Sequence, residues 1–172
     1  MNKFIAFLGV SAIAMFSSEA LAWAPLDAGY PRWDKMPVQY RVNEGTIPPS
    51  IAAIGKARLD QGLASWGAPN CTVWATTNLG NTATSYNAND GQNDFMWASG
   101  SWPQELGPVN SVIGVTMPVW DGSNVIFDAD IVFNNVGFCW NDNGLNNCVD
   151  TLSIATHEQG HFLGLDHSNV GG

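Results

Sequence analysis

The sequence predicts an α+β fold in which a twisted, mostly parallel sheet packs against two helices. Two observations carry this prediction. Several segments alternate apolar and polar residues or are rich in β-branched residues, as strands are. Two other segments have apolar residues at helical spacing, and the first of them lies between two predicted strands. A strand, a crossover helix and a second strand favour parallel pairing.

The N-terminal half is therefore expected to be α/β-like. Residues 37–43 alternate in polarity and predict the first strand. A helix is expected to open at Ile47-Pro48-Pro49-Ser50, because prolines are tolerated in a first helical turn, and Gly67 and Pro69 are expected to stop it. A further strand is predicted near residues 72–77. The polar stretch at residues 78–93, rich in Asn, Thr and Gly, predicts a surface loop.

The C-terminal half begins with a short strand predicted at residues 94–98. Two stronger strand predictions follow at residues 112–120 and 125–134. Only the turn signal Asp121-Gly122-Ser123-Asn124 separates them, so they predict a hairpin in which one strand runs antiparallel. Residues 135–149 predict a loop.

The last predicted helix spans residues 151–163. Asp150 has the side chain of an N-cap, and Gly164 is suited to the residue just past the helix. This helix begins the pattern H-E-x-x-H-x-x-G-x-x-H, at residues 157–167, which contains all three histidines of the chain. The pattern is the most informative stretch of the sequence.

The spacing of the histidines predicts a zinc site. His157 and His161 lie one turn apart on the same helix face. Gly164 lets the backbone leave the helix, so that His167 returns as a third ligand. Three neutral imidazoles leave the fourth tetrahedral position to water, which is typical of a catalytic rather than a structural zinc site. The alternative, a metal-free structural role, requires a coincidence of three histidines and a glycine at fixed offsets.

Glu158 is predicted to be the catalytic base. It adjoins a ligand without being one, and zinc lowers the pKa of bound water toward neutrality. The carboxylate would accept the proton of that water and pass it to a leaving amine, while the metal polarises the scissile carbonyl. The motif therefore predicts hydrolysis of peptide bonds.

The N-terminus reads as a secretory signal peptide at residues 1–22. Lys3 gives a positive start, residues 4–16 are apolar, and Ala20-Leu21-Ala22 is a small-x-small cleavage pattern. The alternative is a short membrane anchor, for which the apolar run is too short. The remaining residues, 23–172, suffice for one domain with a hydrophobic core.

The charge distribution excludes some partners. The formal net charge is −9, and no basic residue follows Arg58. Such an acidic surface repels nucleic acids and anionic membranes. An acidic surface of this kind is typical of an exported protein that can bind calcium. The alternative is that the acidic residues only make the surface soluble. We expect the protein to be a monomer.

Three cysteines, in an exported chain, make a disulfide plausible. Cys139 and Cys148 bracket a polar loop and could close it, or Cys71 could pair with either of them. One thiol is left over in each case. The close C-x-x-C spacing of a cysteine-ligated zinc site is absent.

At the histidine motif the chain resembles the metzincin clan of zinc endopeptidases. Within that clan, Gly160, the run Leu163-Gly164-Leu165 and Ser168 resemble the matrixins, the matrix-metalloprotease-like enzymes that include secreted bacterial members. The resemblance covers residues 37–168. Residues 127–134 also resemble the strand that precedes the active-site loop in bacterial matrixins.

The resemblance implies a metzincin-like fold, a twisted mixed sheet of about five strands with a long crossover helix and a zinc-binding active-site helix. It also implies an antiparallel edge strand along which a protein or peptide substrate binds as an added strand. The alternative is that the edge residues merely complete the sheet. The residues expected at this substrate-binding edge are Val112, Ile113, Gly114, Val115, Thr116 and Met117.

Two departures from the family pattern change what the resemblance implies about latency and about the number of zinc ions. No pro-segment with a zinc-binding cysteine separates the leader from the first strand, so that form of latency is not expected. Histidines for an additional structural zinc are absent, so one catalytic Zn²⁺ is expected. Calcium bound by Asp121, Asp128 or Asp130 is a second candidate, with plain roles in turn and strand as the alternative.

The third departure concerns the end of the chain. Metzincins place a methionine in a tight turn beneath the zinc, but all five methionines precede the motif and only residues 168–172 follow His167. We therefore expect a C-terminally truncated sequence, with residues 23–172 forming a catalytic domain that lacks its C-terminal subdomain. The leading hypothesis is a secreted zinc endopeptidase, and the alternative is a zinc-binding remnant with impaired catalysis.

A carbohydrate-binding module is a further alternative. The chain contains eight tryptophans, a residue that can stack on sugar rings. Because tryptophans are more often core residues, the zinc motif outweighs this hypothesis.

Overall fold

The computed structural model describes residues 24–87 and 89–167. The predicted leader at residues 1–22 lies outside this part of the chain. No helix within the described residues is both long and apolar enough to cross a membrane.

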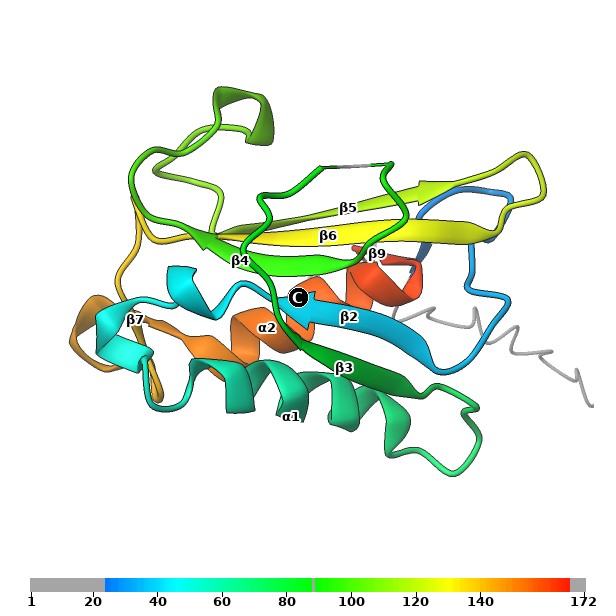
Figure 1. Cartoon of the computed structure of the whole chain (residues 1–172), viewed down its shortest axis with the longest axis horizontal. Coiled ribbons are helices and arrows are strands. Elements are labelled where there is room, and N and C mark those ends of the chain that lie inside the picture. The colour runs from blue at the N-terminus through cyan, green and yellow to red at the C-terminus, as the bar shows by residue number, and fades with distance from the viewer. Residues whose placement is uncertain (1–23, 88, 168–172) are drawn as a thin grey trace, which may run out of the picture.

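A five-stranded mixed sheet forms the centre of the molecule (Figure 1), with strand order β3-β2-β4-β6-β5. The first four of these strands run parallel, and β5 pairs antiparallel with β6 at the edge. The predicted fold class, with its antiparallel edge strand, is thereby confirmed. The strands are β2 (Val38–Val42), β3 (Thr76–Asn81), β4 (Asp94–Ala98), β5 (Gly114–Trp120) and β6 (Ile126–Asn134).

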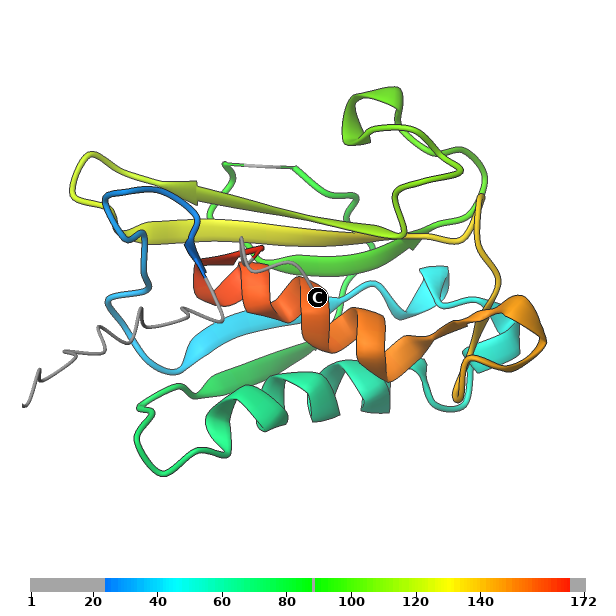
Figure 2. The ribbon, with the colours of Figure 1, turned by 180° about the vertical axis from the view of Figure 1, so that it is seen from behind.

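Two helices accompany the sheet, α1 (Gly55–Gly67) and α2 (Thr151–Leu163). Helix α2 lies behind the sheet in Figure 1 and in front of it in Figure 2, so it covers one sheet face, with α1 alongside. The core between α2 and the sheet is aromatic: Phe162 packs edge-on against Phe95 with ring centroids 5.3 Å apart. Both side chains are fully buried, so they anchor α2 on the sheet.

Helix α2 is also tied to α1 by polar contacts. The side chain of Gln159 donates from Nε2 to the carbonyl of Leu59 at 2.9 Å. Gly62 makes room for this side chain, because a β-carbon there would collide with Gln159 Oε1. Trp66 donates from Nε1 to the carbonyl of Thr156 at 3.0 Å. These contacts fix α2 from the side opposite its functional face.

The predicted start of the first helix is wrong. Two 3₁₀ turns, Glu44–Thr46 and Pro49–Ile51, precede α1, which begins only at Gly55. Ile54 interrupts the helical backbone with φ −129°. The prolines start a turn, as expected, but that turn does not continue into the helix.

The predicted strand at residues 72–77 is displaced, since β3 begins at Thr76 and takes up the first residues of the predicted loop. Val73, which suggested a strand, is 85% exposed, whereas Trp74 packs into the core. Because β3 is an edge strand with only every second residue partly buried, polar residues suffice to form it.

Four two-residue strands were not predicted. They are β1 (Ala24–Pro25), β7 (Trp140–Asn141), β8 (Val149–Asp150) and β9 (Leu165–Asp166). Strands β7 and β8 pair in parallel within the predicted loop 135–149. Such strands are too short to show a periodic pattern.

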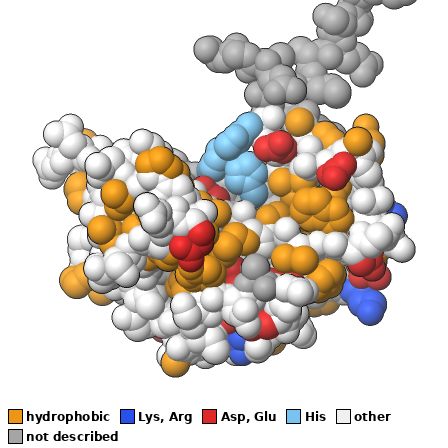
Figure 3. Space-filling view, turned by 90° about the horizontal axis from the view of Figure 1, so that it is seen from above, with side chains coloured by type: hydrophobic (Ala, Val, Ile, Leu, Met, Phe, Trp, Pro, Cys, Tyr) orange, Lys and Arg blue, Asp and Glu red, His pale blue; other side chains and the backbone are white. Residues whose placement is uncertain are grey.

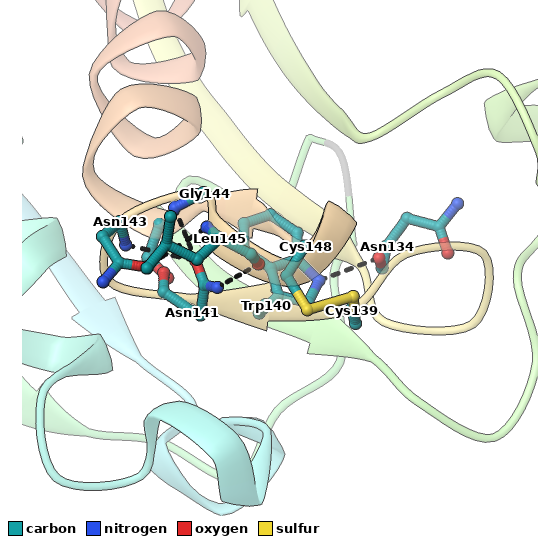
Figure 4. The surroundings of a disulfide bond; sticks show 9 residues. Asn134, Cys139, Trp140, Asn141, Asn143, Gly144, Leu145 and Cys148 are labelled. Carbon is teal, nitrogen blue, oxygen red and sulfur yellow. Dashed lines mark hydrogen bonds between the residues drawn. A yellow bond between two sulfur atoms is a disulfide. The ribbon is translucent and has the colours of Figure 1, made fainter.

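A disulfide between Cys139 and Cys148 closes the loop that joins β7 to β8 (Figure 4). Asn141 organises this loop, since its side chain donates to the carbonyl of Leu145 at 2.6 Å and accepts from the N–H of Gly144 at 2.7 Å. Cys71, the other candidate partner, is a free and exposed thiol. The disulfide loop leads directly into α2 through β8.

Candidate metal centre

Helix α2 has the limits that its capping residues predict. Asp150 accepts hydrogen bonds from the backbone N–H and the hydroxyl of Ser153, at 2.8 and 2.7 Å. Gly164 ends the helix in the left-handed region with φ 106°, and a β-carbon there would collide with the carbonyl of Pro31. Only glycine satisfies both requirements at low cost. The chain therefore turns sharply and brings His167 back toward the helix.

An N-terminal segment holds this turn in place. Strand β9 pairs antiparallel with β1, and the N–H of Leu26 donates to the carbonyl of Gly164 at 3.2 Å. Nothing in the sequence indicated this pairing, because both strands are only two residues long. The loop that carries His167 is thus supported from a region far away in the sequence.

The three predicted ligands converge. His167 Nε2 lies 3.1 Å from His157 Nε2 and 3.2 Å from His161 Nε2. Zn–N bonds of about 2.0–2.1 Å at tetrahedral angles place ligand nitrogens about 3.3–3.4 Å apart, so the spacing fits one zinc ion. Among the described residues, this is the one cluster of three side chains that could hold a metal. The histidines gather at one place on the surface shown in Figure 3.

The ring of His161 is oriented from behind. Its Nδ1 lies 2.7 Å from the carbonyl oxygen of Leu165. Since a carbonyl can only accept, Nδ1 carries the proton and donates it, which leaves the lone pair of Nε2 for a metal. Burial and the neighbouring imidazoles of His161 and His167 lower the pKa of His157, and this favours the neutral form that a metal requires.

Glu158 lines the same pocket as the three histidines and is almost completely buried, at 5% exposure. The hydroxyl of Thr116 is the donor to Glu158. Two oxygens of Glu158 lie within reach of its proton, Oε2 at 2.8 Å and the backbone carbonyl oxygen at 2.9 Å. Gly114 approaches the same carboxylate so closely that a β-carbon would lie 2.9 Å from Oε1. Burial raises the pKa of Glu158, opposed by the Thr116 hydrogen bond and by His161 and His167. A raised pKa suits a carboxylate that takes up and releases a proton.

A groove of about 620 Å³ runs over the histidines and Glu158. Five of the six residues predicted for the substrate-binding edge, Val112 to Thr116, line it, whereas Met117 does not. Met117 lies further along β5, opposite Asp130 of β6. The groove also includes four residues that the sequence did not indicate: Leu26, Ser111, Ile154 and Asp166.

The three aspartates considered for calcium accept backbone hydrogen bonds. Asp121 accepts from Ser123 and Val125 in the hairpin turn. Asp128 Oδ2 accepts from Gly91 at 2.6 Å, and Asp130 accepts from Asn87 and Asp94 at 2.7 Å. These N–H groups tie the carboxylates to the hairpin turn, to Asn87 and Gly91, and to the first residue of β4. Calcium binding at these positions stays a prediction.

Five of the tryptophans belong to the hydrophobic core or pack against it, so they do not form a platform for sugar rings. Trp74, Trp97 and Trp140 lie in the hydrophobic core, and Trp33 and Trp66 pack against it. Such burial is the ordinary role of tryptophan in a globular domain.

The fold and the site together define the class of metallopeptidases whose active-site helix carries H-E-x-x-H. The family model described as Matrixin matches residues 32–172. The chain therefore belongs to the matrixin family, a metzincin family of zinc-dependent metalloendopeptidases. A search of curated proteins returned no match.

Proposed function

We propose that this chain is a secreted endopeptidase in which His157, His161 and His167 bind one Zn²⁺ and Glu158 is the catalytic base. One observation carries the proposal. Three imidazole nitrogens converge at zinc-ligand spacing and line the same groove as a buried carboxylate, beside a sheet edge. The bound metal would supply Lewis-acid polarisation of the scissile carbonyl and acidify a water molecule.

Glu158 performs the proton transfers in this proposal. It accepts the proton of the attacking water and delivers it to the nitrogen of the departing amine. Its burial and its hydrogen bond from Thr116 hold the carboxylate in one orientation. Preorganisation of this kind means that the carboxylate need not reorient during the reaction.

The substrate is a protein or peptide in extended conformation, paired with the free edge of β5. That edge and the two residues before it, Val112 to Thr116, line the groove. Backbone pairing gives affinity that is largely independent of sequence, and the groove selects side chains. The acidic surface, with a net charge of −9, disfavours nucleic acids as partners.

The test is cleavage of casein by the zinc-loaded protein. Glu158→Ala and the nearly isosteric Glu158→Gln should each lower kcat by about 10²–10⁴-fold, the usual contribution of a general base. Both variants should retain zinc, which metal analysis after dialysis would show. Zinc-loaded protein without Glu158-dependent cleavage would instead support the alternative of a metal-binding remnant with impaired catalysis.

Secretion is supported by the composition of residues 1–22 and by the disulfide between Cys139 and Cys148, a bond that persists in oxidising compartments. Expression of the full sequence in a bacterial host should yield a mature protein outside the cytoplasm that begins at Trp23. N-terminal sequencing of the exported fraction would check this. Uncleaved protein retained in the cytoplasm would contradict it.

A further inference from the structure

The free edge of β5 has fewer backbone N–H and carbonyl groups available to pair with an added strand than its length suggests. The carbonyl of Ile113 accepts a hydrogen bond from the N–H of Asn134 at 2.8 Å, which sets the phase of the pairing with β6. In an antiparallel pair, alternate residues direct both backbone groups toward the partner strand. Val115 and Met117 are therefore bonded to β6, whereas Gly114 and Thr116 face outward.

One end of this edge is closed by hydrogen bonds within the chain. Val112 would be the next outward-facing residue before Gly114. Its N–H already donates to the carbonyl of Pro108 at 3.0 Å, and its carbonyl accepts from the side chain of Asn134 at 2.7 Å. A peptide carbonyl cannot pair with the N–H of Val112 without displacing its bond to Pro108, and the Asn134 amide already occupies one lone pair of the Val112 carbonyl.

The other end is closed by Pro118, the next outward-facing residue after Thr116. Proline has no N–H, and its ring carbon occupies the space that the carbonyl of a neighbouring strand would need. Proline is tolerated inside a strand when its nitrogen faces an unpaired edge, and Pro118 satisfies this condition. An added strand therefore loses its pairing beyond Thr116.

We propose, on the basis of the function proposed above, that Gly114 and Thr116 are the residues through which the β5 edge pairs with the substrate backbone, and that this edge offers no further pairing. This two-residue window offers two N–H donors and two carbonyl acceptors. Among the described residues, no hydrogen bond to another segment engages these groups. The substrate class is an extended peptide that pairs with β5 through two backbone N–H groups two residues apart, and residues further along gain no backbone pairing from β5.

The window lies directly beside the proposed catalytic base. The hydroxyl of Thr116 donates to Glu158 Oε2, and a β-carbon on Gly114 would lie 2.9 Å from Oε1 of the same carboxylate. A peptide held by these two residues is therefore positioned next to the proton-transferring group. Along β5, the substrate backbone is therefore paired only beside Glu158.

An N-methyl scan of a casein-derived peptide that the protein cleaves would test the window. Methylation removes one N–H at a time, and a lost hydrogen bond of ordinary strength raises KM about five-fold. We expect two sensitive positions, two residues apart, with the positions outside this pair close to the parent KM. Sensitivity that recurs at more than two alternate positions, or no alternation at all, would overturn the proposal.

Pro118→Ala provides the complementary variant, because it restores the missing N–H and removes the ring. For the parent protein, lengthening the peptide past the window should leave the ratio of long-peptide to short-peptide KM near unity. In Pro118→Ala the KM of the longer peptide should be about five-fold lower than the KM of the shorter one. An unchanged ratio in a variant with the parent's melting temperature contradicts the role of Pro118.

Amide hydrogen exchange separates this proposal from the proposed function. In zinc-loaded Glu158→Ala protein, unfolded casein should newly protect the amides of Gly114 and Thr116, while Val115 and Met117 are protected throughout. This readout requires no turnover, so it stands if cleavage fails. Absence of new protection at Gly114 and Thr116 would refute the window even if casein were cleaved.

Discussion

The hydroxyl of Thr116 is the side-chain contact that most directly orients Glu158, because it donates to a carboxylate that is otherwise enclosed. Thr116→Val keeps the shape and the backbone groups but removes this donor, and hydrogen bonds to charged groups contribute about 1.5–3 kcal/mol. We expect kcat to fall at least about ten-fold with little change in KM. Steady-state kinetics on a casein peptide would measure both.

Thr116→Ser is the matched control, since it retains the hydroxyl and should preserve most of kcat. Equal losses in the valine and serine variants would show that the methyl group or the packing matters instead. Zinc content should be the same in all three proteins, because Thr116 does not touch the histidine nitrogens.

Asp130 gives a residue-scale prediction about stability and pH. Burial raises its pKa to about 6. The backbone N–H groups of Asp94 and Asn87 stabilise the carboxylate and lower the pKa, but burial outweighs them. The unfolded chain titrates near 3.9, so between these values the folded state binds more protons. Stability from this group is present at low pH and is lost as pH rises from about 4 to 6, with a slope of up to about 1.4 kcal/mol per pH unit.

The measurement is urea unfolding of metal-free protein across that pH range, which avoids proton competition at the histidines. Asp130→Asn cannot titrate, so its unfolding free energy should fall less steeply with pH than that of the parent. The variant will be less stable overall, because an amide cannot accept both backbone hydrogen bonds. A parallel slope in the two proteins would refute the assignment.

At the scale of elements, the disulfide loop determines how α2 begins. Cys148 is followed by β8 and then by Asp150, the N-cap of α2. Arg58 of α1 adds a two-pronged ion pair to Asp142 in the loop, although a partly exposed pair of this kind contributes little. The covalent bond is therefore the main restraint on the approach to the helix.

Replacing both Cys139 and Cys148 by serine should lower the unfolding free energy by about 2–3 kcal/mol, the chain-entropy value for a loop this short. Thermal unfolding of the double variant would show a lower melting temperature. Cys71→Ser is the matched control, because Cys71 is exposed and free. A double variant as stable as the control would contradict a stabilising role for the disulfide.

The success of sequence-based prediction differed between elements for physical reasons. Helix α2 was predicted to the residue, because Asp150 and Gly164 act through local backbone geometry that the sequence states directly. The start of α1 and the position of β3 were wrong, because tertiary packing decided them. Val73 faces solvent despite its strand propensity, and a polar segment forms β3 because its neighbour β2 provides the pairing.

At the scale of the whole molecule, metal binding should stabilise the folded state, because the three ligands come together only in the fold. Removing zinc with a chelator should therefore lower the melting temperature. Zinc at about one hundred times its Kd contributes about 2.7 kcal/mol. Calorimetry with and without chelator would measure the difference.

Variants separate metal binding from catalysis in that experiment. Glu158→Ala should keep the zinc-dependent increase in melting temperature, and His161→Ala should lose most of it. The same zinc-dependent increase in His161→Ala would mean that metal stabilises the protein elsewhere.

The candidate site shows which kind of information the sequence contains. The three histidines and Glu158 lie close together in the chain, so their spacing alone predicts their convergence. The residues of the groove walls are not close together in the chain. Leu26 comes from the N-terminal segment and Thr116 from the sheet edge, and each meets α2 only through tertiary structure. The hydroxyl contact of Thr116 and the pairing of β1 with β9 leave no local pattern to find.

That pairing has a practical consequence. Pro25 lies opposite Leu165, whose carbonyl orients His161. Extra residues fused directly before Ala24, or a protease that trims the chain to Asp27, would disturb the backing of one metal ligand without touching the metal itself. A recombinant form with a purification tag on this side could fold normally and still lose zinc, so an inactive preparation should be compared with one tagged elsewhere.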